Sequence, residues 1–125
     1  MTDSDRVLSI AREYHNAWTS RDFARAARLL AADLTIEVPI NSYPTKDSFV
    51  QALTAFGGMV ERTEMLAEFT SGNEALLLYD MHVGPLGVIR IAEHFTANQG
   101  SITRIRQIHD TAPMRAAQLG QAAPG

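Results

Sequence analysis

The stretch that decides the fold is residues 72–110, GNEALLLYDMHVGPLGVIRIAEHFTANQGSITRIRQIHD. Three runs within it, 75–83, 86–97 and 102–109, are rich in aliphatic and β-branched residues. The last two runs also alternate between apolar and polar positions, as half-buried strands do. Gly84-Pro85 and Asn98-Gln99-Gly100 separate the runs and are typical of turns. This pattern predicts consecutive antiparallel strands joined by short turns.

The turns determine which positions share a face of the sheet. A three-residue loop at 98–100 pairs Ile91 with Gln107 and Ile89 with His109. A loop of two or four residues around Gly84-Pro85 places even positions of the first run beside odd positions of the second, whereas a three-residue turn there reverses the first run. If that loop has two or four residues, one largely apolar face of the sheet carries five polar side chains: Asp80, His82, Glu93, Gln107 and His109. Because unpaired burial of such groups is costly, the face predicts a hydrogen-bonded network or a pocket.

The chain before this stretch predicts helices that cover the sheet. Apolar residues at helical spacing indicate helices from Ser4 or Asp5 to Trp18, over 23–32, and from a Thr45 cap to Gly57-Gly58. Strands are expected at 35–40 and 61–70, the second with Met65, Ala67 and Phe69 buried. The fold class is therefore α+β, with three N-terminal helices packed on one face of a curved antiparallel sheet that encloses a pocket.

Composition restricts the class of protein. The chain has 125 residues and a net charge of −3, which fits one domain and gives no basic surface for nucleic acid. It has no cysteine, so disulfides and thiolate metal sites are excluded. No His, Asp and Glu spacing suggests a metal site, and no cofactor motif is present. We expect neither a metal nor a cofactor.

Targeting signals are also absent from the sequence. Residues 1–12 lack an apolar signal-peptide core, and no apolar run approaches the ~20 residues of a membrane span. These features favour a cytoplasmic protein with no membrane partner. We expect a single domain over 1–111 and a mobile C-terminal tail over 112–125, which is rich in Ala, Gln, Gly and Pro.

Several short motifs resemble those of one superfamily. They are Tyr14 to Trp18 leading to Asp22-Phe23, Leu29 to Asp33, Glu93-His94-Phe95, Gly100-Ser101-Ile102, and Ile105 to Asp110. Over residues ~5 to 110 the chain resembles the nuclear transport factor 2-like superfamily, and within it the SnoaL-like group of ketosteroid isomerases, polyketide cyclases and limonene epoxide hydrolase. The resemblance implies a cone-shaped pocket between the first helix and a concave sheet.

The resemblance also assigns roles to some positions. Glu93 stands where many cyclase-like members have an acid, and Gln107 stands where cyclases and epoxide hydrolases usually have an aspartate. An amide cannot act as a general base, so the usual last-strand carboxylate is missing. Asp80 and His82 lie near the arginine and aspartate pair of the epoxide hydrolase, and Thr35 and Glu37 near its tyrosine and asparagine. Because all four identities differ, a close copy of that hydrolase is not expected.

The first functional hypothesis is an enzyme of the isomerase, cyclase or hydratase kind that needs no cofactor. A pocket carboxylate, Asp80 or Glu93, takes a proton from a hydrophobic carbonyl-bearing substrate, and His82, Tyr14 or Gln107 stabilises the oxyanion. The candidate residues fall into two groups. The candidate catalytic residues are Asp80, His82 and Glu93, and the candidate substrate-binding residues are Tyr14, Trp18, Glu37, Ile91, Gln107 and His109.

Each candidate also has a structural interpretation. Asp80 could be held by Arg90 or Arg106, Glu93 could pair with Arg12 or Arg28, and Tyr14 and Trp18 could be core packing. His15 and His94 are expected to point away from the pocket into solvent.

Two alternatives to an enzyme stay open. The first is a non-catalytic dimeric pocket protein that binds a hydrophobic metabolite, and the second is a structural dimerisation domain with a filled interior. The expected partners are a small hydrophobic molecule and a second copy bound through the outer sheet face. That face is expected to carry seven residues: Leu77, Tyr79, Met81, Val83, Arg90, Arg104 and Arg106.

Overall fold

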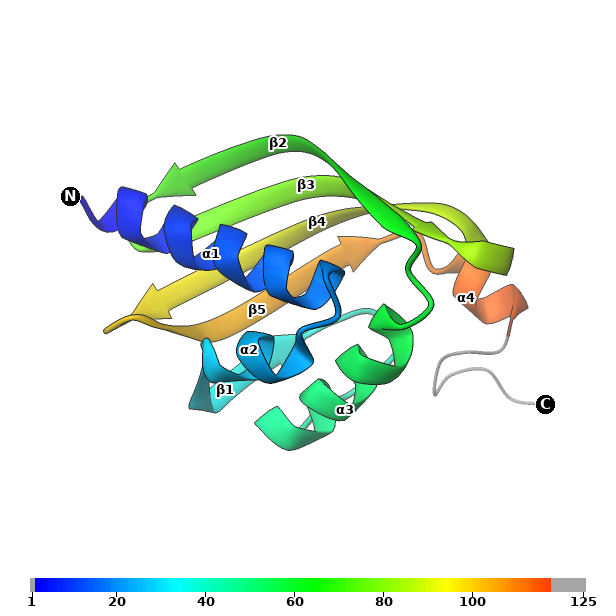
Figure 1. The fold of residues 1–125 in the computed structure, drawn as a ribbon, viewed down its shortest axis with the longest axis horizontal. Coiled ribbons are helices and arrows are strands. Elements are labelled where there is room, and N and C mark those ends of the chain that lie inside the picture. The colour runs from blue at the N-terminus through cyan, green and yellow to red at the C-terminus, as the bar shows by residue number, and fades with distance from the viewer. Residues whose placement is uncertain (1, 118–125) are drawn as a thin grey trace.

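The fold is two layers, with helices covering one face of a five-stranded sheet (Figure 1). A computed structural model describes residues 2–117. The helices are α1 (Asp3–Thr19), α2 (Phe23–Arg28), α3 (Lys46–Gly57) and α4 (Ala112–Ala116), and a 3₁₀ turn, η1, spans Gly84–Leu86. The strands are β1 (Leu30–Glu37), β2 (Arg62–Ser71), β3 (Glu74–Val83), β4 (Gly87–Asn98) and β5 (Ser101–His109). The predicted α+β class, with N-terminal helices on a mostly antiparallel sheet, is confirmed.

The sheet order is β1-β5-β4-β3-β2, so the predicted antiparallel meander of β2 to β5 is present. β1 adds to its edge parallel to β5. It begins at Leu30, and α2 ends at Arg28, whereas the sequence pattern suggested a helix to residue 32. Tertiary contacts explain the difference, because the carbonyls of Leu29 and Leu30 accept bonds from Ile102 N and Lys46 Nζ, both at 2.8 Å.

The turn between β3 and β4 reverses the face that was expected for β3. Val83 pairs with Gly87 across the three-residue η1 turn, so odd positions of the two strands share a face. Gly87 has a φ of +79°, which glycine adopts without strain, and it closes the turn. Leu77, Tyr79, Met81 and Val83 therefore point into the core, while Asp80 and His82 lie on the outer face.

The hairpin between β4 and β5 is tighter than expected. Gln99 and Gly100 both have positive φ and form a two-residue turn that closes on Asn98 and Ser101, with a bulge just beyond it. The face assignment of both strands is correct, but the register moves by two residues. Glu93 pairs with Gln107 and Ile91 with His109, so the predicted rows joining Ile91 to Gln107 and Ile89 to His109 are wrong.

A bulge in β2 changes the expected burial of that strand. The register shifts between Met65 and Ala67, after which Phe69 faces outward and is 61% exposed. Glu68 instead turns toward α1, where Arg12 Nε donates to it at 2.9 Å. The predicted burial of Phe69 is therefore wrong, because an extra residue in a strand inverts every later side chain. Met65 lies before the bulge, and its predicted burial is also wrong, since it is 37% exposed on this edge strand.

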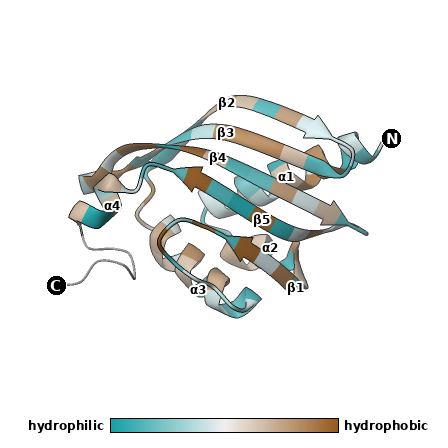
Figure 2. Cartoon of the chain, turned by 180° about the vertical axis from the view of Figure 1, so that it is seen from behind, coloured by the Kyte–Doolittle hydropathy of each residue, from teal (hydrophilic) through white to brown (hydrophobic). Residues whose placement is uncertain are grey.

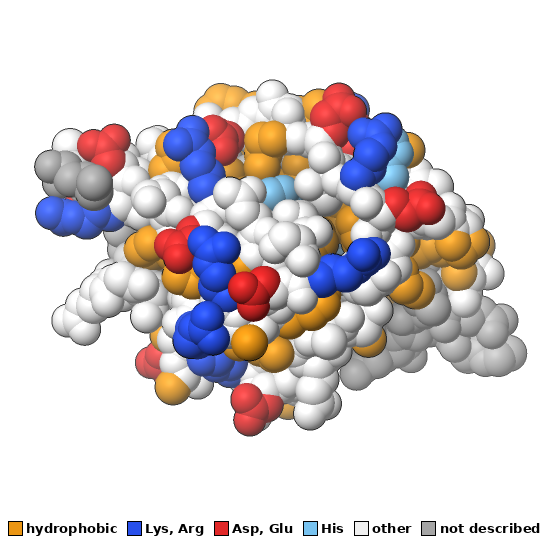
Figure 3. Space-filling model, viewed as in Figure 1, with side chains coloured by type: hydrophobic (Ala, Val, Ile, Leu, Met, Phe, Trp, Pro, Cys, Tyr) orange, Lys and Arg blue, Asp and Glu red, His pale blue; other side chains and the backbone are white. Residues whose placement is uncertain are grey.

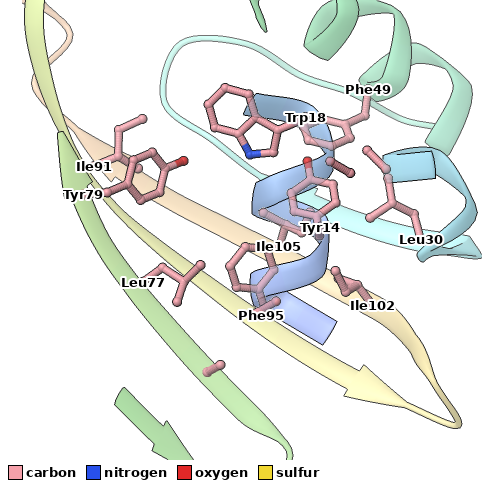
Figure 4. Packing of buried hydrophobic residues seen from close by; sticks show 14 of the residues in the cluster. Tyr14, Trp18, Leu30, Phe49, Leu77, Tyr79, Ile91, Phe95, Ile102 and Ile105 are labelled. Atoms are coloured by element: carbon pink, nitrogen blue, oxygen red, sulfur yellow. The ribbon is translucent and has the colours of Figure 1, made fainter. Parts of the chain in front are cut away.

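The core lies between α1 and the inner face of the strands (Figure 4). Tyr14 of α1 meets the ring of Phe95 edge-on at a centroid distance of 5.7 Å. Leu77, Ile102 and Ile105 are fully buried around this pair. Within the expected tail, Ala112–Ala116 form α4 and Met114 packs on the core, while 118–125 lie outside the described residues. Within residues 2–117 no helix is long and apolar enough to cross a membrane.

Neighbouring leucines on β3 provide a test of its inner face. Leu77→Ala is expected to lower the free energy of unfolding by about 2–5 kcal/mol, because it opens a cavity in the core. The matched change Leu78→Ala, on the outer face of the same strand, is expected to cost less than about 1 kcal/mol. Urea unfolding of both variants at a dilution that keeps the protein monomeric gives the comparison. A larger loss for Leu78→Ala would mean that β3 has the opposite face inward.

Candidate functional site

A cavity of about 370 Å³ opens between α1, α3, the 38–44 loop and the inner face of β3 to β5. This volume is at the small end of the ~300–1,000 Å³ typical of small-molecule sites. Its wall is mostly aromatic and thioether side chains: Tyr14, Trp18, Tyr43, Phe49, Phe56, Tyr79, Met59, Met81 and Met114. Its polar lining residues are Asn41, Glu93, Gln107 and His109. The interior is therefore an apolar chamber with a few polar groups, and it is not filled by side chains.

Glu93 is the buried acid of this chamber, with 1% of its surface exposed. Its two oxygens accept hydrogen bonds from the two neighbouring strands. Tyr79 Oη on β3 donates to Oε1 at 2.8 Å, and Gln107 Nε2 on β5 donates to Oε2 at 2.7 Å. Burial raises the pKa of Glu93, and the bonds from Gln107 and Tyr79 oppose that rise. The carboxyl group is thus held in place by neutral donors instead of a cation.

Tyr14 provides a second polar group at the deep end of the cavity. Its hydroxyl is fully buried and has no hydrogen-bond partner among residues 2–117. In Figure 4 this hydroxyl points toward Trp18 and Phe49, which both line the cavity. Burial, and then the negative charge of Glu93, raise the pKa of Tyr14 well above its ordinary value, so the hydroxyl keeps its proton. An unpartnered buried donor is costly, and a ligand that accepts from it would remove that cost.

Tyr79 completes the set of groups around Glu93. It is 1% exposed, and burial followed by the charge of Glu93 raises its pKa well above the ordinary value. The Tyr79 hydroxyl is therefore a permanent donor to the Glu93 carboxyl. Chemically, the arrangement offers one general acid or base, Glu93, and a hydroxyl donor, Tyr14, in a largely apolar cavity.

Two of the predicted catalytic residues are not in this chamber. Asp80 and His82 lie on the outer face of β3, paired in register with Arg90 and Val88. Arg90 holds Asp80 by two bonds, Nε to Oδ1 at 2.8 Å and Nη2 to Oδ2 at 3.0 Å. Hydrogen bonds from Arg90 lower the pKa of Asp80. The expectation that Asp80 and His82 face the cavity is wrong, and Asp80 matches the ion pair left open as its structural interpretation.

The cavity does contain most of the other sequence candidates. Tyr14, Trp18, Ile91, Glu93, Gln107 and His109 all line it. Glu37 is exposed at the end of β1 and does not line the cavity, so its position does not support the predicted role in substrate binding. The structural alternative for Glu93 is also wrong, since Arg12 pairs with Glu68 instead.

The observed position of His15 differs most from its predicted position. It was expected in solvent, but it is 5% exposed, and its Nε2 lies 3.2 Å from Thr63 Oγ1. Its ring packs edge-on against Tyr79 and Trp18 at centroid distances of 4.6 Å and 5.4 Å. Burial lowers its pKa to about 4, so the imidazole is neutral at physiological pH. The contact of His15 on α1 with Thr63 on β2 joins residues 48 apart in the sequence and leaves no trace in the local sequence pattern.

Other lining residues come from segments without a periodic pattern. Val38, Pro39 and Asn41 belong to the loop after β1, Met59 follows α3, and Met114 lies on α4. Only the meeting of these segments in space identifies them. Over the described residues, no cluster of His, Asp and Glu is suited to a metal ion.

Comparisons with known proteins agree with this architecture. A family model described as a SnoaL-like domain matches residues 11–105. No protein of curated function matches the sequence. A crystal structure of a protein from Kribbella flavida DSM 17836, described as of known function, is 33% identical, covers 89% of this chain and 92% of its own, and has a TM-score of 0.83.

Two more distant solved structures share the fold. An LEH-like epoxide hydrolase of M. tuberculosis is 21% identical, with 93% of this chain and 91% of the other covered and a TM-score of 0.74. A steroid delta-isomerase of Pseudomonas aeruginosa is 17% identical, with 84% and 80% covered and a TM-score of 0.71. At such identities the likeness concerns the fold alone, which is of the nuclear transport factor 2-like type.

The two tyrosines of the site predict opposite effects on stability. Tyr14→Phe removes an unpartnered buried hydroxyl and is expected to raise the free energy of unfolding by about 1 kcal/mol. Tyr79→Phe is the matched control, because it removes the same atom from a bonded position. It is expected to lower that free energy by about 1–3 kcal/mol, since one carboxyl oxygen of Glu93 is left without its donor. Urea unfolding measures both, and a loss on Tyr14→Phe as large as that on Tyr79→Phe would show that the Tyr14 hydroxyl is bonded.

Proposed function

The chain belongs to the SnoaL-like domain family, and we propose that it is an acid–base enzyme acting on a small hydrophobic carbonyl compound without a cofactor. The nuclear transport factor 2-like proteins to which this family is related include isomerases, cyclases and epoxide hydrolases. The observation that carries the proposal is Glu93, a carboxyl group of raised pKa in an apolar cavity beside the unpartnered hydroxyl of Tyr14.

The proposed reaction is proton transfer next to the carbonyl. Glu93 takes a proton from the carbon adjacent to the carbonyl, and the electron pair of that C–H bond moves to the carbonyl oxygen as an enolate. Tyr14 donates a hydrogen bond to this oxygen as its charge develops. The enolate then takes the proton back from Glu93 at the same or a conjugated carbon, which restores the carboxylate. A raised pKa suits a group that must both accept and return a proton near neutral pH.

Gln107 has a positioning role in this scheme. By the resemblance, Gln107 stands where cyclases and epoxide hydrolases usually have an aspartate, and its amide cannot take a proton. Its Nε2 donates to Oε2 of Glu93, so it fixes the carboxyl group while Glu93, on the neighbouring strand, performs the chemistry. The acid is therefore proposed to act from β4, with the amide on β5 as its support.

A binding protein without catalysis is the second candidate function. Both oxygens of Glu93 already accept bonds from the protein, as in a purely structural polar network. On this alternative the cavity holds a hydrophobic metabolite and the Tyr14 hydroxyl bonds to it without any proton transfer.

The exchange of carbon-bound hydrogen distinguishes the two candidates. With 1-tetralone in D₂O, the wild-type protein is expected to accelerate incorporation of deuterium beside the carbonyl, followed by NMR. Glu93→Gln is expected to reduce the rate by about 10²–10⁴-fold and Tyr14→Phe by about 100-fold. Asp80→Asn is the matched control, because this carboxylate lies on the other face of the sheet, and it should leave the rate unchanged. Binding of 1-tetralone with no exchange, or exchange that survives Glu93→Gln, would reject catalysis by Glu93.

The outer sheet face is proposed to bind a second copy. The residues expected there from sequence were partly wrong, because Leu77, Tyr79, Met81 and Val83 point inward. The face instead carries Leu76 and Leu78 beside Val88 and Ile108, which are 55% and 74% exposed. Figure 2 shows these strands from the outer side, with hydrophobic and hydrophilic segments mixed. Exposed apolar side chains on a sheet face suit a symmetric interface.

A single charge on this face tests the dimer. Wild-type protein is expected to sediment as a dimer, and Ile108→Glu as a monomer, because the new charge would be buried between copies. Gln51→Glu adds the same charge to the exposed side of α3 and should remain dimeric. Figure 3 shows the helical side of the molecule, where charged side chains of both signs lie among hydrophobic ones. A monomeric wild type, or a dimer that survives Ile108→Glu, would exclude this interface.

A further inference from the structure

The more exposed end of the cavity carries a histidine whose proton position is fixed by its neighbour. His109 lines the cavity, and its Nδ1 lies 3.0 Å from the backbone carbonyl of Asp110. A carbonyl oxygen can only accept, so Nδ1 carries the hydrogen and donates it. The neutral ring then has its lone pair on Nε2, which makes Nε2 a hydrogen-bond acceptor.

The strand register places His109 on the same face as the acid, two residues beyond its partner on β5. His109 follows Gln107 by two residues on the same face of β5, so their Cα atoms are ~7 Å apart along the strand. Gln107 pairs with Glu93, and His109 pairs with Ile91. Glu93 is 1% exposed, whereas His109 is half-buried. The cavity therefore has Glu93 and Tyr14 at its deep end and His109 toward solvent.

The charges of the lining restrict what can bind between these ends. Among residues 2–117, no lysine or arginine lines the cavity. A carboxylate or phosphate at the deep end would meet the Glu93 carboxyl group without a compensating cation, which disfavours anionic ligands. Tyr14 offers a donor and both oxygens of Glu93 already accept bonds, so the cavity suits a ligand that accepts at the deep end and donates farther out.

We propose that His109 determines substrate specificity by accepting a hydrogen bond, through Nε2, from a hydroxyl group of the substrate. The substrate class is then a neutral hydrophobic ketone with a hydroxyl group at its opposite end. This inference rests on the proposed function, because it takes the carbonyl to lie at Tyr14 and Glu93. It adds the feature that would separate the true substrate from other apolar ketones.

A pair of rigid probes isolates the hydroxyl group. 1-Tetralone and 6-hydroxy-1-tetralone differ only by a hydroxyl on the far side of the ring from the carbonyl, and calorimetry gives the ratio of their affinities. The wild-type protein is expected to prefer the hydroxylated probe by about tenfold, the value of one hydrogen bond. His109→Phe keeps an aromatic ring without the acceptor and should reduce the preference to about onefold. His109→Gln can place an amide oxygen near the Nε2 position and should retain most of it.

The outcomes separate this inference from the proposed function. No preference in the wild type, or a preference that survives His109→Phe, would mean that the hydroxyl binds elsewhere and would overturn the role of His109. If 1-tetralone still exchanges its hydrogen in a manner that depends on Glu93, the proposed function stands and only the His109 inference fails. If 1-tetralone neither binds nor exchanges, the proposed function is rejected and this inference with it.

Discussion

A carboxyl group buried in the middle of a sheet is the constraint on which the rest of this structure depends. Glu93 lies at the centre of β4 with 1% of its surface exposed, and burial of such a group without donors would cost several kcal/mol. Each neighbouring strand contributes one donor, Tyr79 from β3 and Gln107 from β5. Both bonds exist only in the observed register, because a shift of one residue would turn either donor to the other face. The site and the strand pairing are therefore one physical requirement.

The strand register also explains which site residues could be predicted from the sequence and which could not. Periodicity identified β3, β4 and β5, and it assigned the inner faces of β4 and β5 correctly, so Glu93, Gln107 and His109 were found. It failed for β3 because two assignments of Gly84-Pro85 were open, and the reversed strand took Asp80 and His82 out of the site. Gly87 was the available signal, since a second glycine with positive φ closes a three-residue turn.

Other parts of the site could not have been predicted from local pattern at all. The contact of Thr63 with His15 joins segments 48 residues apart in the sequence, and the start of β1 at Leu30 depends on bonds from residues far along the chain. Loop residues such as Asn41 and Met59 reach the cavity only through tertiary packing. Such contacts depend on tertiary packing between distant segments, and the local pattern of a single sequence does not reveal them. The cone-shaped pocket was predicted from the family resemblance, whereas the buried acid was predicted from the pattern of polar residues on the strands.

The central claim is that Glu93 is a buried carboxyl group stabilised by neutral donors, with its pKa raised by burial. Protein labelled with ¹³C at the glutamate side-chain carboxyl, titrated by NMR, tests this most directly, and Glu93→Gln identifies the resonance by its loss. We expect the pKa of Glu93 to lie above 4.5, the ordinary value for a glutamate side chain. A Glu93 resonance that titrates at or below 4.5 would contradict the account, because it would show that solvent or a cation stabilises the charged form.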